Sequence, residues 1–83
     1  MAPRGPRYGS SAQKKRILKA QGYTCGYCQG PLDIEGAALD HRVPWSSGGK
    51  TEDSNLLACH RAENRAKLNM DEETYRQIAR NAI

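Results

Sequence analysis

The sequence has no phenylalanine and only one tryptophan, and hydrophobic residues make up 37% of its 83 positions. A chain of this length buries only roughly 60% of the surface that it exposes when unfolded, so its core contributes little stability. No apolar run approaches the roughly 20 residues that a membrane-spanning helix needs. We therefore expect a small soluble domain, without membrane contact, that needs a stabilising element besides its hydrophobic core.

Cysteine is also scarce: Cys25, Cys28 and Cys59 are the three in the chain. An odd number of thiols cannot pair completely within one chain. The basic amino end is not followed by an apolar stretch of the signal-peptide type, so we expect the protein in the cytoplasm. Because that compartment disfavours disulfides, a bound metal ion is the expected stabilising element.

Acidic residues are absent from the first 20 positions, although the whole chain has 9 Asp and Glu against 13 Lys and Arg, a formal net charge of +4. The basic side chains within those positions are Arg4, Arg7, Lys14, Lys15, Arg16 and Lys19. This asymmetry favours a polyanionic partner, because clustered Lys and Arg bind phosphate groups. A basic tail that only solubilises the chain is the other interpretation.

The pattern of Pro, Gly and capping residues divides the chain into a flexible basic arm at residues 1–9 and a single domain at 10–83. The domain is expected to begin with a cationic helix from Ala12 to Gln21, capped by Ser10 or Ser11. The elements expected after it are a turn-rich stretch at 23–36, a strand at 37–43, a polar loop at 46–53, a helix from Asp53 or Ser54 to Lys67, and a last helix at 70–82 capped by Asn69 or Asp71. The apolar stripe of that last helix is typical of core packing and comprises Tyr75, Ile78, Ala79 and Ala82.

Residues that carry chemistry gather between Asp40 and Lys67. The chain reads Asp-His-Arg-Val-Pro-Trp-Ser-Ser-Gly-Gly from Asp40, then Asn55-Leu56, then Asn-Arg-Ala-Lys from Asn64. This ordered set resembles the HNH endonuclease family, whose pattern runs Asp-His, Pro, Gly-Gly, Asn-Leu and Asn-x-x-Lys. The resemblance covers residues 23–68 and rests on several elements in order at suitable spacing.

The resemblance implies an α+β protein with the small ββα-metal fold, also called the His-Me finger. In that fold a two-stranded hairpin and a helix surround a catalytic ion, and here a zinc knuckle and flanking helices would be added. The implied activity is metal-dependent hydrolysis of phosphodiester bonds in DNA, by nicking or by double-strand cleavage. Stand-alone chains of this size resemble those found near phage packaging genes, which implies the host cell cytoplasm as the location.

The family pattern also implies roles for individual residues. His41 would be the general base, because a neutral imidazole near pH 7 can take a proton from water. Asp40 and Asn64 would hold a divalent cation, Mg²⁺ or Mn²⁺, through hard oxygen atoms. Asn55, the middle letter of the motif, would tie the loop backbone through its amide and so fix the direction of His41.

Basic residues near the motif and in the first helix are the expected DNA contacts: Arg42, Arg65, Lys67, Lys14, Lys15 and Arg16. Lys67 also suits the carboxyl end of a helix without any nucleic acid. Trp45 and Tyr27 either stack on bases or belong to the core, and the core is favoured. The expected partners are DNA and, as a further hypothesis, phage packaging proteins, with the chain a monomer or a weak homodimer.

Zinc-containing members of the family usually carry two Cys-x-x-Cys pairs. Cys25 and Cys28 form the first pair, whereas the second falls on His60 and Glu63. The expected zinc ligands are Cys25, Cys28 and His60, with Cys59 or Glu63 as the fourth. On a helix, residues 59 and 60 diverge by about 100°, so both would not reach one ion without local unwinding. Two alternatives stay open, namely free thiols without zinc and His60 or Glu63 as a ligand of the catalytic ion.

Two other classes of function are compatible with these residues. A zinc-stabilised DNA-binding module without catalysis would need only the basic segment and the Cys25-x-x-Cys28 knuckle. A subunit of a phage packaging assembly would use the apolar face of the last helix. A pure binder has no need of Asp40, His41 and Asn64 together, so the nuclease is the favoured interpretation.

Overall fold

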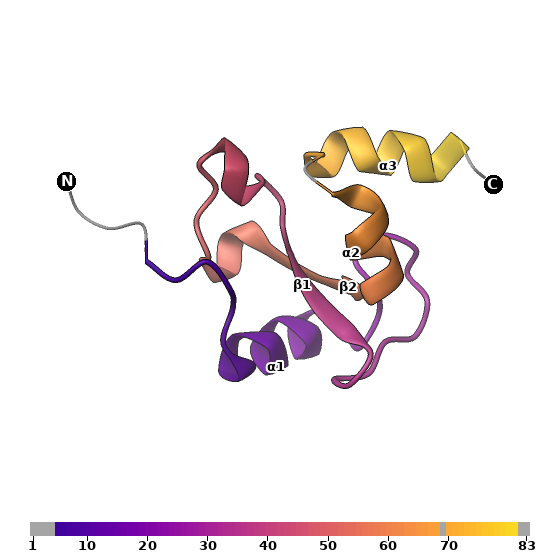
Figure 1. Ribbon diagram of the computed structural model, residues 1–83. Coiled ribbons are helices and arrows are strands. Elements are labelled where there is room, and N and C mark those ends of the chain that lie inside the picture. Colours follow the sequence, from indigo (N-terminus) through magenta and orange to yellow (C-terminus); the bar gives the residue numbers. More distant parts are fainter. Residues whose placement is uncertain (1–4, 69, 82–83) are drawn as a thin grey trace.

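The computed structural model describes residues 5–68 and 70–81, with the side chains of 79–81 left aside (Figure 1). The elements in chain order are α1 (Ser11–Ala20), β1 (Ala37–His41), the 3-10 turns η1 (Trp45–Ser47) and η2 (Asp53–Asn55), β2 (Leu56–His60), α2 (Arg61–Lys67) and α3 (Glu72–Asn81). None of the described helices is long and apolar enough to cross a bilayer. A hairpin followed directly by a helix is the ββα arrangement of an α+β fold, as the resemblance implied.

The hairpin is antiparallel, with Ala37 paired with His60 and His41 paired with Leu56. The prediction of one helix from residue 53 or 54 to Lys67 is therefore wrong in its first half. Leu56–His60 is a strand whose first four residues are all buried, because α1 covers one side of the hairpin and α2 the other (Figure 1). Pairing with β1 and burial on both faces outweigh the helix-start signal of residues 53 to 55.

The first helix forms where the sequence predicts it. Ser10 accepts a hydrogen bond from the backbone N–H of Gln13 at 3.1 Å, and the Gln13 side chain accepts from the backbone N–H of Ser10 at 2.9 Å. This reciprocal capping box satisfies N–H groups that a helix start otherwise leaves unpaired. Ile17 and Leu18 are buried against Leu56, so α1 contributes the apolar face expected of it.

The last helix matches the prediction at its start, where the Asp71 carboxylate accepts the backbone N–H of Thr74 at 2.8 Å. The alternative cap, Asn69, lies outside the described residues, as do the side chain of Ala79 and all of Ala82. Tyr75 is buried and its ring meets that of Tyr27 edge-on at 4.9 Å, but Ile78 is 49% exposed. The predicted apolar stripe is therefore only partly packed against the domain.

Candidate active site and metal centre

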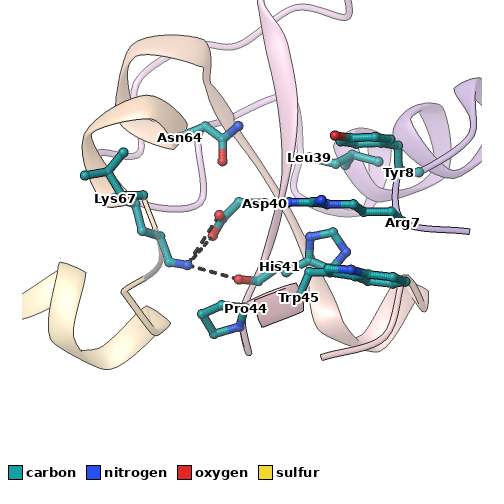
Figure 2. A pocket seen from close by; sticks show the side chains of 11 residues that line it. Arg7, Tyr8, Leu39, Asp40, His41, Pro44, Trp45, Asn64 and Lys67 are labelled. Carbon is teal, nitrogen blue, oxygen red and sulfur yellow. Dashed lines mark hydrogen bonds and ion pairs between the residues drawn. The ribbon is translucent and has the colours of Figure 1, made fainter. Parts of the chain in front are cut away.

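A cavity of about 190 Å³ opens between β1, α2 and the segment that precedes α1 (Figure 2). Asp40, His41 and Asn64, which the sequence predicts to act together, all line it. The other lining residues are Arg7, Tyr8, Gly9, Leu39, Pro44, Trp45, Lys67 and Leu68. The structure thus brings His41 and Asn64, 23 residues apart in sequence, to one concave site.

Asp40 is buried at the floor of this cavity and its carboxylate is held by two side chains. The Lys67 ammonium lies 3.3 Å from Oδ1 and 3.1 Å from Oδ2. The Tyr27 hydroxyl donates a hydrogen bond to Oδ2, and burial followed by this contact raises the pKa of Tyr27. The ion pair and the hydroxyl hydrogen bond therefore compensate the burial of the Asp40 carboxylate. Tyr27 is therefore a packed residue that supports the site, in line with the favoured interpretation.

Lys67 is buried, whereas a residue that binds DNA phosphate would lie on the surface. Its side chain is 1% exposed, and its ammonium also donates to the main-chain carbonyl of His41 at 3.0 Å. Three internal oxygen atoms, two from Asp40 and one from His41, thus surround the charge. The predicted contact of Lys67 with DNA does not fit this placement, because the ammonium serves as an internal counter-ion.

His41 ends β1, and its ring forms one wall of the cavity. Its Nε2 lies 2.9 Å from the Thr51 hydroxyl, and its ring meets that of Trp45 edge-on at 6.0 Å. Burial is the largest influence on the ring and lowers the pKa of His41; the nearby Asp40 raises it, and the positive charges of Lys67 and Arg7 lower it further. The net direction is downward, so the imidazole is neutral at pH 7 and able to accept a proton.

The loop between the strands is closed by the side-chain amide of Asn55. Its Oδ1 accepts from the backbone N–H of Val43 at 2.9 Å, and its Nδ2 donates to the carbonyls of Val43 at 3.2 Å and Lys50 at 2.8 Å. This tie of the loop backbone confirms the geometry that the resemblance implied. Gly49 is required there, since a Cβ would lie 1.8 Å from the Val43 carbonyl oxygen.

Asn64 reaches the cavity from α2, and Figure 2 shows its amide directed toward the carboxylate of Asp40. A carboxylate and an amide oxygen are ligands that Mg²⁺ and Mn²⁺ accept, with water and substrate oxygen atoms filling the other positions. The Lys67 ammonium already neutralises part of the Asp40 charge. The donor set therefore fits one hard divalent cation supported by few protein ligands.

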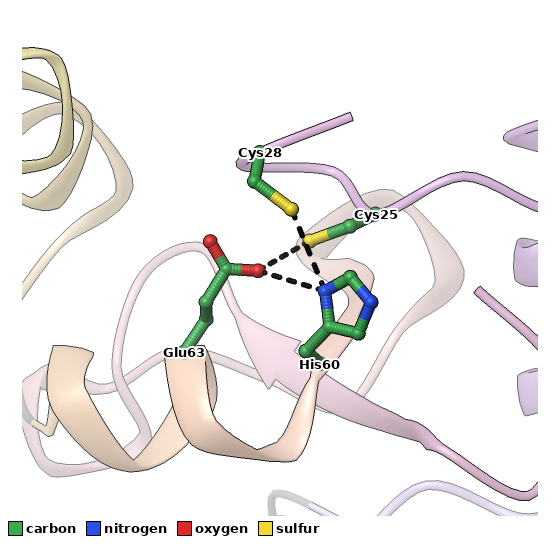
Figure 3. Close-up of side chains that lie close together, drawn as sticks. All are labelled: Cys25, Cys28, His60 and Glu63. Atoms are coloured by element: carbon green, nitrogen blue, oxygen red, sulfur yellow. Dashed lines mark hydrogen bonds and ion pairs between the residues drawn. The ribbon is translucent and has the colours of Figure 1, made fainter. Parts of the chain in front are cut away.

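A second cluster of ligand-type side chains comprises Cys25, Cys28, His60 and Glu63 (Figure 3). One donor atom from each lies within 4.8 Å of all the others. Cys25 and Cys28 come from the knuckle, His60 ends β2, and Glu63 lies in the first turn of α2. Neither His60 nor Glu63 lines the cavity around His41, so the alternative that they bind the catalytic ion does not fit the structure.

The donor atoms of this cluster are oriented for a metal ion. The Nε2 of His60 lies 3.0 Å from the Pro31 carbonyl, which can only accept, so Nε2 carries the proton and Nδ1 faces Glu63 at 3.1 Å and Cys28 at 3.5 Å. A carbonyl behind the ligating ring is the usual support of a metal-bound histidine. Zinc bonds of about 2.0–2.3 Å place tetrahedral ligands about 3.5 Å apart, which needs only small movements here.

Cys59 does not belong to this cluster, which corrects its place among the possible zinc ligands. The premise of a helix at residues 59 and 60 was wrong, but the conclusion that both cannot reach one ion holds for another reason. Successive side chains of a strand point to opposite faces, so Cys59 turns into the core when His60 turns to the knuckle. Its thiol is fully buried, and that burial raises the pKa of Cys59. Glu63 is therefore the fourth member of the candidate metal site.

Of the residues predicted to contact DNA, Lys67 alone lines the cavity. The others lie elsewhere on the domain: Lys14, Lys15, Arg16, Arg42 and Arg65. Arg42 forms an ion pair with Glu72 of α3 at 2.7 Å, and Arg16 one with Asp53 at 3.0 Å. The cation that sequence reasoning did not single out is Arg7, whose side chain extends beside the ring of His41 in Figure 2. The basic composition of residues 1–9 was a signal for it, but composition does not show which residue packs against the site.

A hairpin, a helix and a cavity that joins Asp40, His41 and Asn64 define a ββα-metal protein of the nuclease type. The sequence model of the HNH endonuclease family matches residues 25–69, more than half of the chain. The chain belongs to the HNH endonuclease family, which implies nuclease activity. No individual curated protein has a matching sequence.

Proposed function

We propose that this protein is a metal-dependent endonuclease that hydrolyses phosphodiester bonds of DNA in the cavity around His41. The observation that carries the proposal is the convergence of Asp40, His41 and Asn64 on that one cavity. Metal-dependent hydrolysis of a phosphodiester requires a general base beside oxygen ligands for a divalent cation, and these three residues supply both in one cavity. A protein that only binds DNA gains nothing from a neutral histidine beside a buried carboxylate.

In this mechanism the neutral ring of His41 takes a proton from the attacking water. Asp40 and Asn64 would hold a divalent cation, which would supply positive charge to the phosphate and the departing oxygen. Lys67 and Tyr27 hold the Asp40 carboxylate in place at the cavity. As the proton moves from water to the imidazole, the water oxygen bonds to phosphorus and the bond between phosphorus and the leaving oxygen breaks. The leaving oxygen departs with the bonding electron pair and takes a proton from solvent.

DNA is proposed as the substrate because the chain is cationic and one guanidinium stands at the reacting groups. Arg7 is exposed and lines the cavity beside His41, whereas Lys67, the other cation there, is committed to Asp40. A guanidinium can hold a phosphate through two parallel hydrogen bonds. Arg7 is therefore the proposed anchor of the scissile phosphate, and Arg65, exposed on α2, a proposed contact with the flanking backbone.

We further propose that Cys25, Cys28, His60 and Glu63 bind a structural zinc ion. Two thiolates, an imidazole and a carboxylate are all ordinary zinc ligands, and four protein ligands close the site against substrate. The backbone N–H groups of Tyr27 and Gly30 donate to the sulfur atoms of Cys25 and Cys28, respectively, at 3.4 Å, which holds both sulfur atoms in the knuckle. The ion would fasten the knuckle to the junction of β2 and α2, at the end of the hairpin opposite His41.

The test of this function is cleavage of supercoiled plasmid by protein that has been freed of metal and then reloaded with one equivalent of Zn²⁺. We expect nicked or linear plasmid only after Mg²⁺ or Mn²⁺ is added. An Asn64→Ala variant, which keeps a good helix former on α2, should require a much higher concentration of the added ion. Plasmid that stays intact with every ion, while the folded protein still binds DNA, would replace the nuclease with a non-catalytic binding module.

The pH dependence of cleavage is expected to follow the lowered pKa of His41. The base works only when neutral, and a lower pKa keeps it neutral in more acidic solution. The single-turnover rate should therefore rise with pH and reach half its plateau at a pH below the ordinary histidine pKa of about 6.5. Rates measured at saturating metal across this range check the expectation, and a half-maximum above that value would contradict it.

A further inference from the structure

Thr51, which lies in the loop between η1 and η2, links His41 to the amino-terminal segment. Its hydroxyl oxygen is 2.9 Å from the Nε2 of His41 and 2.9 Å from the main-chain carbonyl of Arg7. Its own carbonyl accepts a hydrogen bond from the side chain of Gln13 on α1 at 3.1 Å. Thr51 is thus held by α1 and by the amino-terminal segment, and its hydroxyl oxygen contacts the ring.

The direction of these hydrogen bonds follows from counting protons. A carbonyl can only accept, so the single hydroxyl proton of Thr51 is donated to Arg7. The hydroxyl oxygen must then accept from His41, which places a proton on Nε2. In a neutral imidazole one nitrogen carries the proton and the other the free lone pair, so the lone pair lies on Nδ1.

We propose that Thr51 is a positioning residue for the hydrolysis reaction, whose hydroxyl holds the neutral ring of His41 as the Nε2–H tautomer and so leaves Nδ1 to accept the proton of water. The inference rests on the proposed function, because it assigns the base nitrogen of that reaction. It adds a contact that Asn55 does not supply, since Asn55 ties the loop backbone and Thr51 holds the ring itself.

The amino-terminal segment takes part in this arrangement through its backbone. Gly9 packs closely against β1, since a Cβ there would lie 2.5 Å from the Leu39 side chain. Arg7 then presents its carbonyl to Thr51 and its guanidinium to the cavity. The segment before α1 therefore contributes both to the direction of the base and to the proposed phosphate anchor.

The test compares Thr51→Val, which has nearly the same shape without the hydroxyl, with Thr51→Ser, which keeps the hydroxyl. Proton and nitrogen NMR of the zinc-loaded protein, at a pH where His41 is neutral, should show a slowly exchanging ring N–H at Nε2 in the parent and in Thr51→Ser. In Thr51→Val that signal should be lost and the two tautomers should mix. The thermal midpoint and the backbone spectrum serve as controls for folding.

Activity is measured on the same three proteins. We expect Thr51→Val to lower the single-turnover rate roughly 10- to 100-fold, the scale of a misplaced reacting group, with DNA and metal affinities unchanged and with Thr51→Ser close to the parent. A Thr51→Val variant that keeps the parent rate overturns the proposal, whether or not the ring signal is lost. A parent that shows the ring signal but cleaves no DNA overturns the proposed function and leaves the tautomer assignment standing.

Discussion

Loss of the ion from the site of Cys25, Cys28, His60 and Glu63 is expected to unfold the domain. A core of this size rarely supplies more than about 3–5 kcal/mol, whereas structural zinc binds with about 10–16 kcal/mol in small metal-dependent domains. The metal-free protein and a Cys25→Ser variant should therefore lose the cooperative thermal transition that the zinc-loaded parent shows. Calorimetry or circular dichroism on heating measures this directly.

The identity of the ligands is tested with Co²⁺ in place of zinc. We expect the absorption of a tetrahedral site with two thiolates, and its loss in Cys28→Ala. Cys59→Ala is the matched control, because it removes a thiol of the same chain that lies in the core and outside the cluster. A Cys59→Ala protein with an altered cobalt spectrum, or a parent that binds no metal and still unfolds cooperatively, would contradict the assignment.

Substitution of Lys67 by methionine is expected to cost about 3–5 kcal/mol of unfolding free energy, the usual effect of removing one partner of a buried ion pair. The side chain of Lys67 is 1% exposed and that of Asp40 is 5% exposed. Methionine fills much of the same volume, so the loss reflects the uncompensated carboxylate and the lost hydrogen bond to the His41 carbonyl and not an empty space. Urea unfolding of the zinc-loaded protein gives the difference.

Arg65→Met is the matched control for this measurement, because Arg65 lies on the same helix and is exposed. Its effect should stay within about 0.5 kcal/mol. In the double variant Lys67→Met with Asp40→Asn, part of the lost stability should return, since the buried charge is gone. Equal effects of Lys67→Met and Arg65→Met would show that the pair does not hold the floor of the cavity.

The parts of the fold that were predictable from the sequence are those with strong local signals. Ser10 and Gln13 define the start of α1, and the knuckle and the motif residues follow their family pattern. The strand at Leu56–His60 was not predictable from local propensity, because its conformation depends on pairing with β1. The same error affected Cys59, whose exclusion from the cluster depends on the alternation of a strand.

The candidate site shows the same division between residue identity and residue placement. Asp40, His41 and Asn64 stand out in the sequence because their types and spacing match a known reaction. The roles of Lys67, Arg7 and Thr51 depend on distances across the fold. A lysine near a helix end is usually exposed, so its burial against Asp40 becomes visible only when α2 is placed on β1.

The measurement that tests the central claim most directly is the single-turnover cleavage rate of a labelled DNA duplex by the parent and by His41→Ala. Both proteins are loaded with zinc, supplied with saturating Mg²⁺ or Mn²⁺, and first shown to have equal thermal midpoints and equal affinity for the duplex. We expect the variant to be slower by about 10²–10⁴-fold, the usual contribution of a general base. Equal rates for the two proteins would contradict the account and remove His41 from the chemistry.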